Sequence, residues 1–153
     1  MYTRQQASQL RQSFWTTFGQ YMSPILSAEG LRTNWINYKT GEPHLTFKMD
    51  ATDKCATIAI VLAHPDLDIQ QLYFEQSLHL KKMLHETLEE EWVWEQQIID
   101  DNGRTISRIY KQLNDVSIFR KEDWPQLIAF FKQRIIALDS FWDIAKLAFE
   151  SLR

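Results

Sequence analysis

Glu95 and Arg108 are the residues of this sequence whose types and spacing most readily suggest chemistry. They lie in the stretch EWVWEQQIIDDNGRTISRIYK, residues 91–111, on either side of an Asn-Gly pair that is typical of a two-residue β-hairpin turn. With that turn, Glu95 is expected opposite Tyr110 and diagonal to Arg108, on the same face of the sheet. The arginine would bind a carboxylate or phosphate, and the glutamate would act as a base or orient the arginine. The structural alternative, which we favour, is an ion pair that bridges two strands.

The remaining residues of this hairpin have a structural and a functional interpretation. Trp92 and Trp94 are expected on the opposite face, with Ile98 and Ile109, where tryptophans either stack a nucleic-acid base or, more commonly, pack under a helix. Basic residues are concentrated in and after the second strand, and they either form solvated surface or contact phosphates. The candidate nucleic-acid-binding residues are Arg104, Arg108, Lys111, Arg120 and Lys121.

A second polar and aromatic group occurs earlier in the chain. Trp35, Asn37, Tyr38 and Lys48 are expected on a first β-hairpin, where they would line a pocket or, as we favour, pack on an ordinary sheet. Cys55 stands in the apolar run CATIAIVLA, which favours a buried and unreactive thiol.

Metal-ligating residues occur only in pairs. Glu75 with His79, and His85 with Glu89, have the i, i+4 spacing that places two ligands on one helix face. Neither pair has a visible third ligand, and the sequence holds no His-Glu-x-x-His motif or glycine-rich phosphate loop. No metal and no cofactor is therefore predicted.

Length and composition indicate a single domain, residues 1–153, with an ordinary core. The chain has 153 residues, 44% of them hydrophobic, and a net charge of −3, which supplies no global attraction for nucleic acid. The N-terminus lacks an apolar signal segment, and no apolar run is long enough to span a membrane. A cytoplasmic protein of bacterial type is the expectation.

Hydrophobic periodicity predicts an α+β fold. The expected elements are a helix at 4–22, strands at 34–39, 44–50 and 55–63, a helix at 65–88, hairpin strands at 91–99 and 105–112, a further strand at 115–119, and a long helix at 123–152. The short connections between strands favour an antiparallel sheet of five to six strands, with helices mostly on one face. The order is thus α-βββ-α-ββ(β)-α.

The last helix is the clearest pattern in the chain. Its apolar residues recur at spacings of four and three from Trp124 to Leu152, and Asp123 is the expected N-cap. A helix of that length measures about 45 Å, longer than most small sheets need. Part of it is therefore expected to project and to form a homodimer interface through Ile135, Trp142 and Phe149.

Three short motifs resemble a bacterial family of domains of unknown function. They are Trp94-Glu95 after a helix, Arg108-Ile109 on the following strand, and Trp124 in the terminal helix. Some relatives of this type are stand-alone chains, mainly from Bacteroidetes, and others carry the domain C-terminal to a restriction-endonuclease-like domain. The resemblance implies an association with nucleic-acid enzymes or defence systems, and it implies no reaction.

A nuclease of that type needs an Asp on one strand and an Asp/Glu-x-Lys motif on the next to hold its metal. Asp50 is followed only by Asp53-Lys54 in a turn and then by an apolar strand, so this catalytic pair is missing. Three hypotheses follow: a non-catalytic interaction module with a protein partner or a second copy, a nucleic-acid binder, and an enzyme on a small anionic substrate that uses Arg108 and Glu95. We favour the first.

Overall fold

A computed structural model describes residues 2–153, which form a single four-stranded antiparallel sheet with helices. The sheet order is β1-β2-β4-β3. The elements are α1 (Arg4–Met22), β1 (Leu45–Ala51), β2 (Cys55–Leu62), α2 (Leu67–His79), α3 (Lys81–Leu88), β3 (Val93–Ile99), β4 (Thr105–Asn114), the 3₁₀ turn η1 (Lys121–Asp123) and α4 (Trp124–Glu150). The predicted α+β class and antiparallel sheet are confirmed, whereas the predicted five to six strands are wrong.

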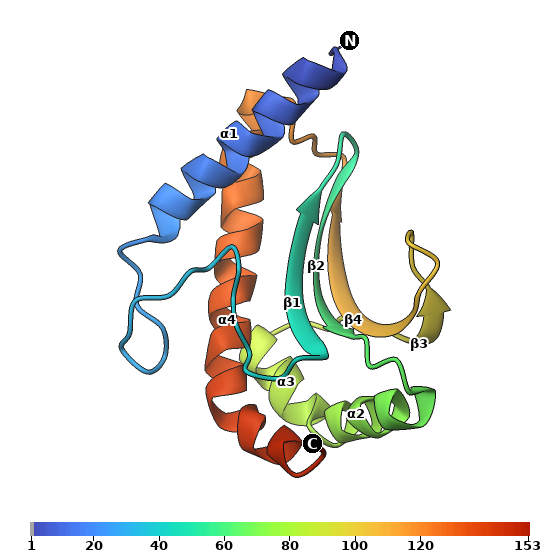
Figure 1. The fold of residues 1–153 in the computed structure, drawn as a ribbon. Helices are drawn as coiled ribbons and strands as arrows, with labels where there is room; N and C mark the ends of the chain where they lie inside the picture. Colours follow the sequence, from blue (N-terminus) through green and yellow to red (C-terminus); the bar gives the residue numbers. More distant parts are fainter. Residues whose placement is uncertain (1) are drawn as a thin grey trace.

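The helices lie on one side of a curved sheet (Figure 1). The helix α4 runs along the sheet, α1 packs on its N-terminal half, and α2 and α3 lie below the bend of β4. The β3–β4 hairpin curls away from this helix layer, so the opposite face of the sheet is concave. No helix in residues 2–153 combines the length and apolarity needed to cross a membrane.

The core lies between the convex face of the sheet and α4. Along β2, Ile58, Ile60 and Leu62 point to the helices and are buried, which is the period-two pattern of a strand with one covered face. The buried residues of α4 extend from Leu127 to Phe149, because the helix lies on the sheet and on α3 for most of its length. The expected projection of this helix beyond the sheet is therefore not observed.

Two predicted strands are loops that side-chain hydrogen bonds to nearby backbone groups hold in place. In segment 34–39, Trp35 Nε1 donates to the Ile25 carbonyl at 3.0 Å, and the Asn34 side chain accepts from the backbone N–H of Asn37 at 3.1 Å. In segment 115–119, Asp123 accepts from the backbone N–H of Ser117 at 2.9 Å instead of capping α4. Local bonds of this kind compete with a sheet ladder.

The predicted helix at 65–88 is divided at Leu80 into α2 and α3. Asp66 caps α2 as expected, since its carboxylate accepts from the backbone N–H groups of Asp68 and Ile69. Leu80 leaves the helical conformation at φ −99°, ψ 6°, and Glu89 ends α3 with a left-handed φ of 57°. The break lets α2 contact β2, β4 and α4, while α3 packs mainly on α4.

The β3–β4 hairpin has a different turn and register from those predicted. Only Gly103 has a positive φ in this turn, 76°, so Asp101, Asn102 and Gly103 form a three-residue loop in place of a type I′ turn. A β-bulge then places Gln96 and Gln97 opposite a single residue of β4. Together the two shifts bring Glu95 directly opposite Arg108.

A buried polar network holds the bulge. The hydroxyl of Ser107 accepts from the backbone N–H of Gln97 at 2.9 Å and donates to Oε1 of Gln70, also at 2.9 Å. Nε2 of Gln70, a fully buried side chain on α2, donates to the carbonyls of His64 and Thr105. The helix layer thus fixes the left-handed φ of 49° at Gln97 and the curl of the hairpin.

Removing the Ser107 hydroxyl tests this network. Ser107→Ala leaves the buried Oε1 of Gln70 without its donor, and a buried unsatisfied group costs about 1–3 kcal/mol. We expect that loss in urea unfolding, together with faster amide hydrogen exchange in β3. Gln112→Ala, at an exposed site of the same strand, should change stability by less than about 0.5 kcal/mol. Equal stability of both variants would contradict the role of the network.

Candidate functional site

The concave face of the sheet brings together the residues predicted to do chemistry. The strand registers place Thr46, Val61, Arg108 and Glu95 in one row across this face, and Lys48, Ala59, Tyr110 and Val93 in the next. Within residues 2–153, no helix covers these rows (Figure 1). The side chains therefore face solvent or a ligand, while the intervening residues of each strand pack in the core.

Arg108 and Glu95 form a cross-strand ion pair on this face. Nε of Arg108 lies 2.7 Å from Oε1 of Glu95, and the side chains are 32% and 31% exposed. The guanidinium also lies over the ring of Tyr110, 4.1 Å from its centroid. An ion pair of this exposure contributes only about 0–1 kcal/mol to stability, so its main effect is to hold Arg108 in one orientation with both Nη atoms available for an acceptor.

The concave face is hollowed into a groove of about 280 Å³ next to Arg108. Its floor is apolar and small, with Ala59 and Val61 from β2 and Ile106 from β4. Lys48 and Asp50 of β1 line it as well, and so do Ile98, Ile99, Asp100, Asp101 and Asn102 of the curled hairpin. We call this feature the sheet groove.

The bulge is what completes the sheet groove. In an unbroken strand Ile98 would share the helix side with Trp94, as predicted, but the extra residue turns Ile98 to the concave face opposite Ile106. Trp94 and Ile109 do pair on the helix side as predicted, and Phe74 packs against Trp94 there. The sequence pattern alone could not show that Ile98 changes face, because hydrophobic alternation assumes that each residue of β3 lies opposite one residue of β4.

The basic residues predicted to bind nucleic acid do not gather on one surface. Arg108 lies on the concave face, and Arg104 is exposed at the hairpin end. Lys111 pairs with Ile58 and so points to the helix side of the sheet. Arg120 lies 2.8 Å from Asp123, and the ammonium of Lys121 lies 5.9 Å from the ring centroid of Trp124, both at the start of α4.

The residues predicted to form a subunit interface lie inside the single chain. Ile135, Trp142 and Phe149 are 0%, 3% and 1% exposed and belong to the core between α4 and the sheet. Trp142 also donates its Nε1–H to the carbonyl of Thr40 at 2.7 Å. A second copy of the chain would contact other side chains, because these three are already covered.

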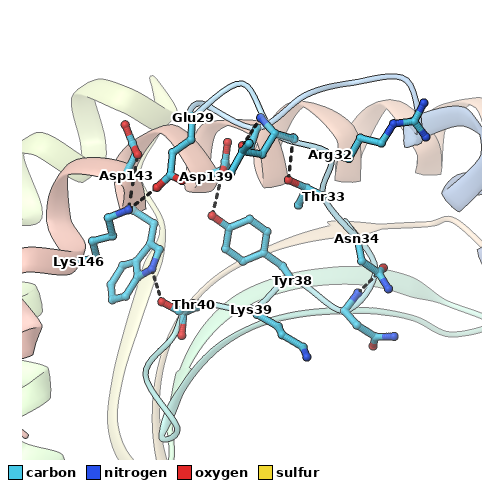
Figure 2. A pocket seen from close by; sticks show the side chains of 14 residues that line it. Glu29, Arg32, Thr33, Asn34, Tyr38, Lys39, Thr40, Asp139, Asp143 and Lys146 are labelled. Carbon is cyan, nitrogen blue, oxygen red and sulfur yellow. Dashed lines mark hydrogen bonds and ion pairs between the residues drawn. The ribbon is translucent and has the colours of Figure 1, made fainter.

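A second cavity, of about 640 Å³, lies between α4 and the irregular segment 23–44 (Figure 2). Asp139, which is 5% exposed, fixes this segment to the helix. Its Oδ1 accepts from the hydroxyl of Tyr38 at 2.5 Å, and its Oδ2 accepts from the backbone N–H of Ala28 at 2.7 Å. Figure 2 shows the ring of Tyr38 at the centre of this cavity, below Asp139.

Charged groups at one side of the cavity are paired with each other. Lys146 pairs with Glu29 and lies 3.7 Å from Asp143, and it holds the pKa of the Glu29 carboxyl below its usual range. The early polar-aromatic group is thus divided: Asn37 and Tyr38 line this cavity, Lys48 lines the sheet groove, and Trp35 is buried. Within residues 2–153, no cluster of three or more metal-ligating side chains occurs.

Sequence inspection missed the acidic anchor Asp139. One signal was present, since an aspartate next to Leu138 interrupts the most apolar helix of the chain. A charge placed among buried positions must be paired or hydrogen-bonded. Its partners, the Tyr38 hydroxyl and the Ala28 amide, come from a loop more than 100 residues away, which no local pattern reveals.

The Tyr38–Asp139 bond gives a pH dependence. Burial, together with the hydrogen bond to Asp139 and its charge, raises the pKa of Tyr38 above its ordinary value of 10.0. The folded protein thus holds this proton more tightly than the unfolded chain does, and the resulting stability is complete below pH 10 and is lost as pH rises above it. Tyr38→Phe removes that dependence together with the bond.

We expect Tyr38→Phe to be less stable than wild type near pH 8. Above pH 10 the difference should shrink by up to about 1.4 kcal/mol per pH unit. Urea unfolding at pH 8, 10 and 11 measures it. Phe47→Leu is the control, because it changes the ring stacked on Tyr38 without removing a titrating group. A difference between Tyr38→Phe and wild type that stays constant across these pH values would contradict the assignment.

Comparison with known proteins gives one match. The model of a family described as "Domain of unknown function (DUF4268)" matches residues 10–146 of the chain. This range includes all four strands of the sheet and all the residues that line the two cavities. Neither the curated proteins nor the solved structures give a significant match.

Proposed function

The chain belongs to the family described as Domain of unknown function (DUF4268), and from its geometry we propose that it is a non-catalytic interaction module that binds a protein partner in the sheet groove. One observation carries the proposal. An entire face of the sheet, with the sheet groove at its centre, has no helix over it within residues 2–153, whereas the helix layer packs on the other face.

The layer arrangement supports a partner at this face. Sheets bury their apolar faces against another layer, and here one layer is present on the convex side only. The concave side nevertheless carries apolar residues in and around the sheet groove, among them Val61, Ile98 and Ile106, and Val93 in the row of Tyr110 is 50% exposed. An apolar centre with a charged rim is the usual composition of a protein–protein interface.

The Glu95–Arg108 pair supports recognition better than catalysis. Glu95 is engaged by Arg108 at 2.7 Å, so a role as general base would first require this pair to open. Arginine and tyrosine are the residues that most often contribute strongly to protein interfaces, and Arg108 is stacked on Tyr110 beside the sheet groove. The scattered basic residues and the acidic rim provide no comparable support for a nucleic-acid interface.

We further propose that the partner belongs to a nucleic-acid-processing system of restriction or defence type. This part of the proposal rests on the sequence resemblance, in which related domains stand beside restriction-endonuclease-like domains. The chain would then be an accessory component that brings its partner into such a complex.

Adjacent residues of β2 provide a matched test, because Val61 faces the sheet groove and Ile60 faces the core. Val61→Arg should leave the stability within about 1 kcal/mol of wild type. Ile60→Arg should unfold the chain, because a buried unpaired charge costs several kcal/mol. Urea unfolding compares the two variants.

Binding is then measured with a partner purified from host complexes and recombined with the purified chain. Val61→Arg should weaken its affinity about a hundredfold, the size expected for a central interface residue. Glu86→Arg, at an exposed site on α3, is the control for an added arginine and should bind like wild type. Unchanged affinity of Val61→Arg would overturn the proposed function.

A further inference from the structure

We infer that the segment received by the sheet groove is an amphipathic α-helix with basic residues beside its apolar ridge. The inference rests on the proposed function and names the chemistry of the partner. Three properties of the sheet groove support it: the charges on its walls, its width, and the small apolar residues of its floor.

The walls of the sheet groove have an excess of negative charge on one side. Arg108 is balanced by Glu95, and Lys48 by Asp50 two residues further along the same face of β1. The hairpin wall has Asp100 and Asp101, and no cation lines the groove beside them.

The two aspartates of this wall are available to a partner. Oδ1 of Asp100 accepts from the backbone N–H groups of Asn102 and Arg104, while Oδ2 of Asp100 and the carboxylate of Asp101 have no partner within residues 2–153. Arg104 stands at the base of the loop and does not line the groove. A basic side chain of the partner would form an ion pair with one of these aspartates. Binding removes water from that basic side chain, and a carboxylate without another partner offsets this cost best.

The width favours a helix. The walls come from β1 and from the β3–β4 hairpin, with β2 and β4 between them. In the order β1-β2-β4-β3, three strand spacings of about 4.8 Å each separate β1 from β3. The resulting distance of about 14 Å leaves room between the walls for a helix with its side chains, which is about 10–12 Å wide. The convex face of the same sheet already receives a helix, α4, in the equivalent manner (Figure 1).

The floor favours large apolar side chains at helical spacing. Ala59 and Val61 are small, so they leave space above β2 for a leucine or phenylalanine from the partner. Ile98 and Ile106 face each other across the hairpin and form the apolar end of this floor. A helix with anchors at i, i+3 or i+4 and i+7 would fill it, as in other helix-in-groove complexes.

Two synthetic peptides test the inference on the full chain. Both have about 14 residues, roughly four helical turns, with the same leucine ridge, but one has lysines and the other glutamates beside that ridge. Calorimetric titration should detect binding of the lysine peptide and none of the glutamate peptide. Asp101→Lys should lower affinity for the lysine peptide about tenfold and Val61→Arg should abolish binding, whereas Glu86→Lys should have no effect.

The outcomes separate the inference from the proposed function. If both peptides bind equally, or if Asp101→Lys and Glu86→Lys have the same effect, the basic-helix inference is overturned. If Val61→Arg weakens the natural partner while Asp101→Lys does not, the inference fails and the proposed function stands. If light scattering shows a dimer that Val61→Arg dissociates, a second copy occupies the groove and the inference is likewise overturned.

Discussion

The hydroxyl of Ser107 is the contact on which the concave face depends. It is fully buried, it accepts from the amide of Gln97 on β3, and it donates to Gln70 on α2. Through these two bonds the helix layer holds an extra residue in the hairpin. That residue sets Glu95 opposite Arg108, turns Ile98 to the concave side, and bends the hairpin until its loop becomes a wall of the sheet groove. The helix layer on the convex face therefore determines the geometry of the concave face.

The helices and the central strands were predictable because their hydrophobic residues recur at regular spacing and lie mainly on one face of each element. The two lost strands were not, since the side chains of Asn34, Trp35 and Asp123 hydrogen-bond backbone groups three to ten residues away along the chain. These local side-chain bonds compete with a sheet ladder and override the preference for β-structure. The helix predicted at 65–88 is divided at Leu80, where the chain leaves the helical conformation and lets α2 contact the sheet as well as α4.

The candidate site was predictable only in part. Alternation along each strand placed Glu95 and Arg108 on one face, and this held in spite of the changed register because two single-residue shifts restore the parity. The sheet groove itself requires the order β1-β2-β4-β3, which brings Lys48 opposite Ala59 and Val61 opposite Arg108. The sequence of a single strand does not show which strands lie beside it in the sheet. Asp101 and Val61 therefore could not be identified from the sequence as residues that line the sheet groove.

Both edges of the sheet also have features that hinder pairing with a further strand, which bears on aggregation. At one edge, the bulged β3 presents a left-handed Gln97 whose side chain donates to the Leu67 carbonyl. At the other edge, Thr40 and Arg11 donate to the terminal carbonyls of β1, at Leu45 and Ala51. Native proteins use such devices to prevent edge-to-edge polymerisation. These features make the sheet edges poorer templates for fibril growth, although the chain displays a concave, partly apolar sheet surface.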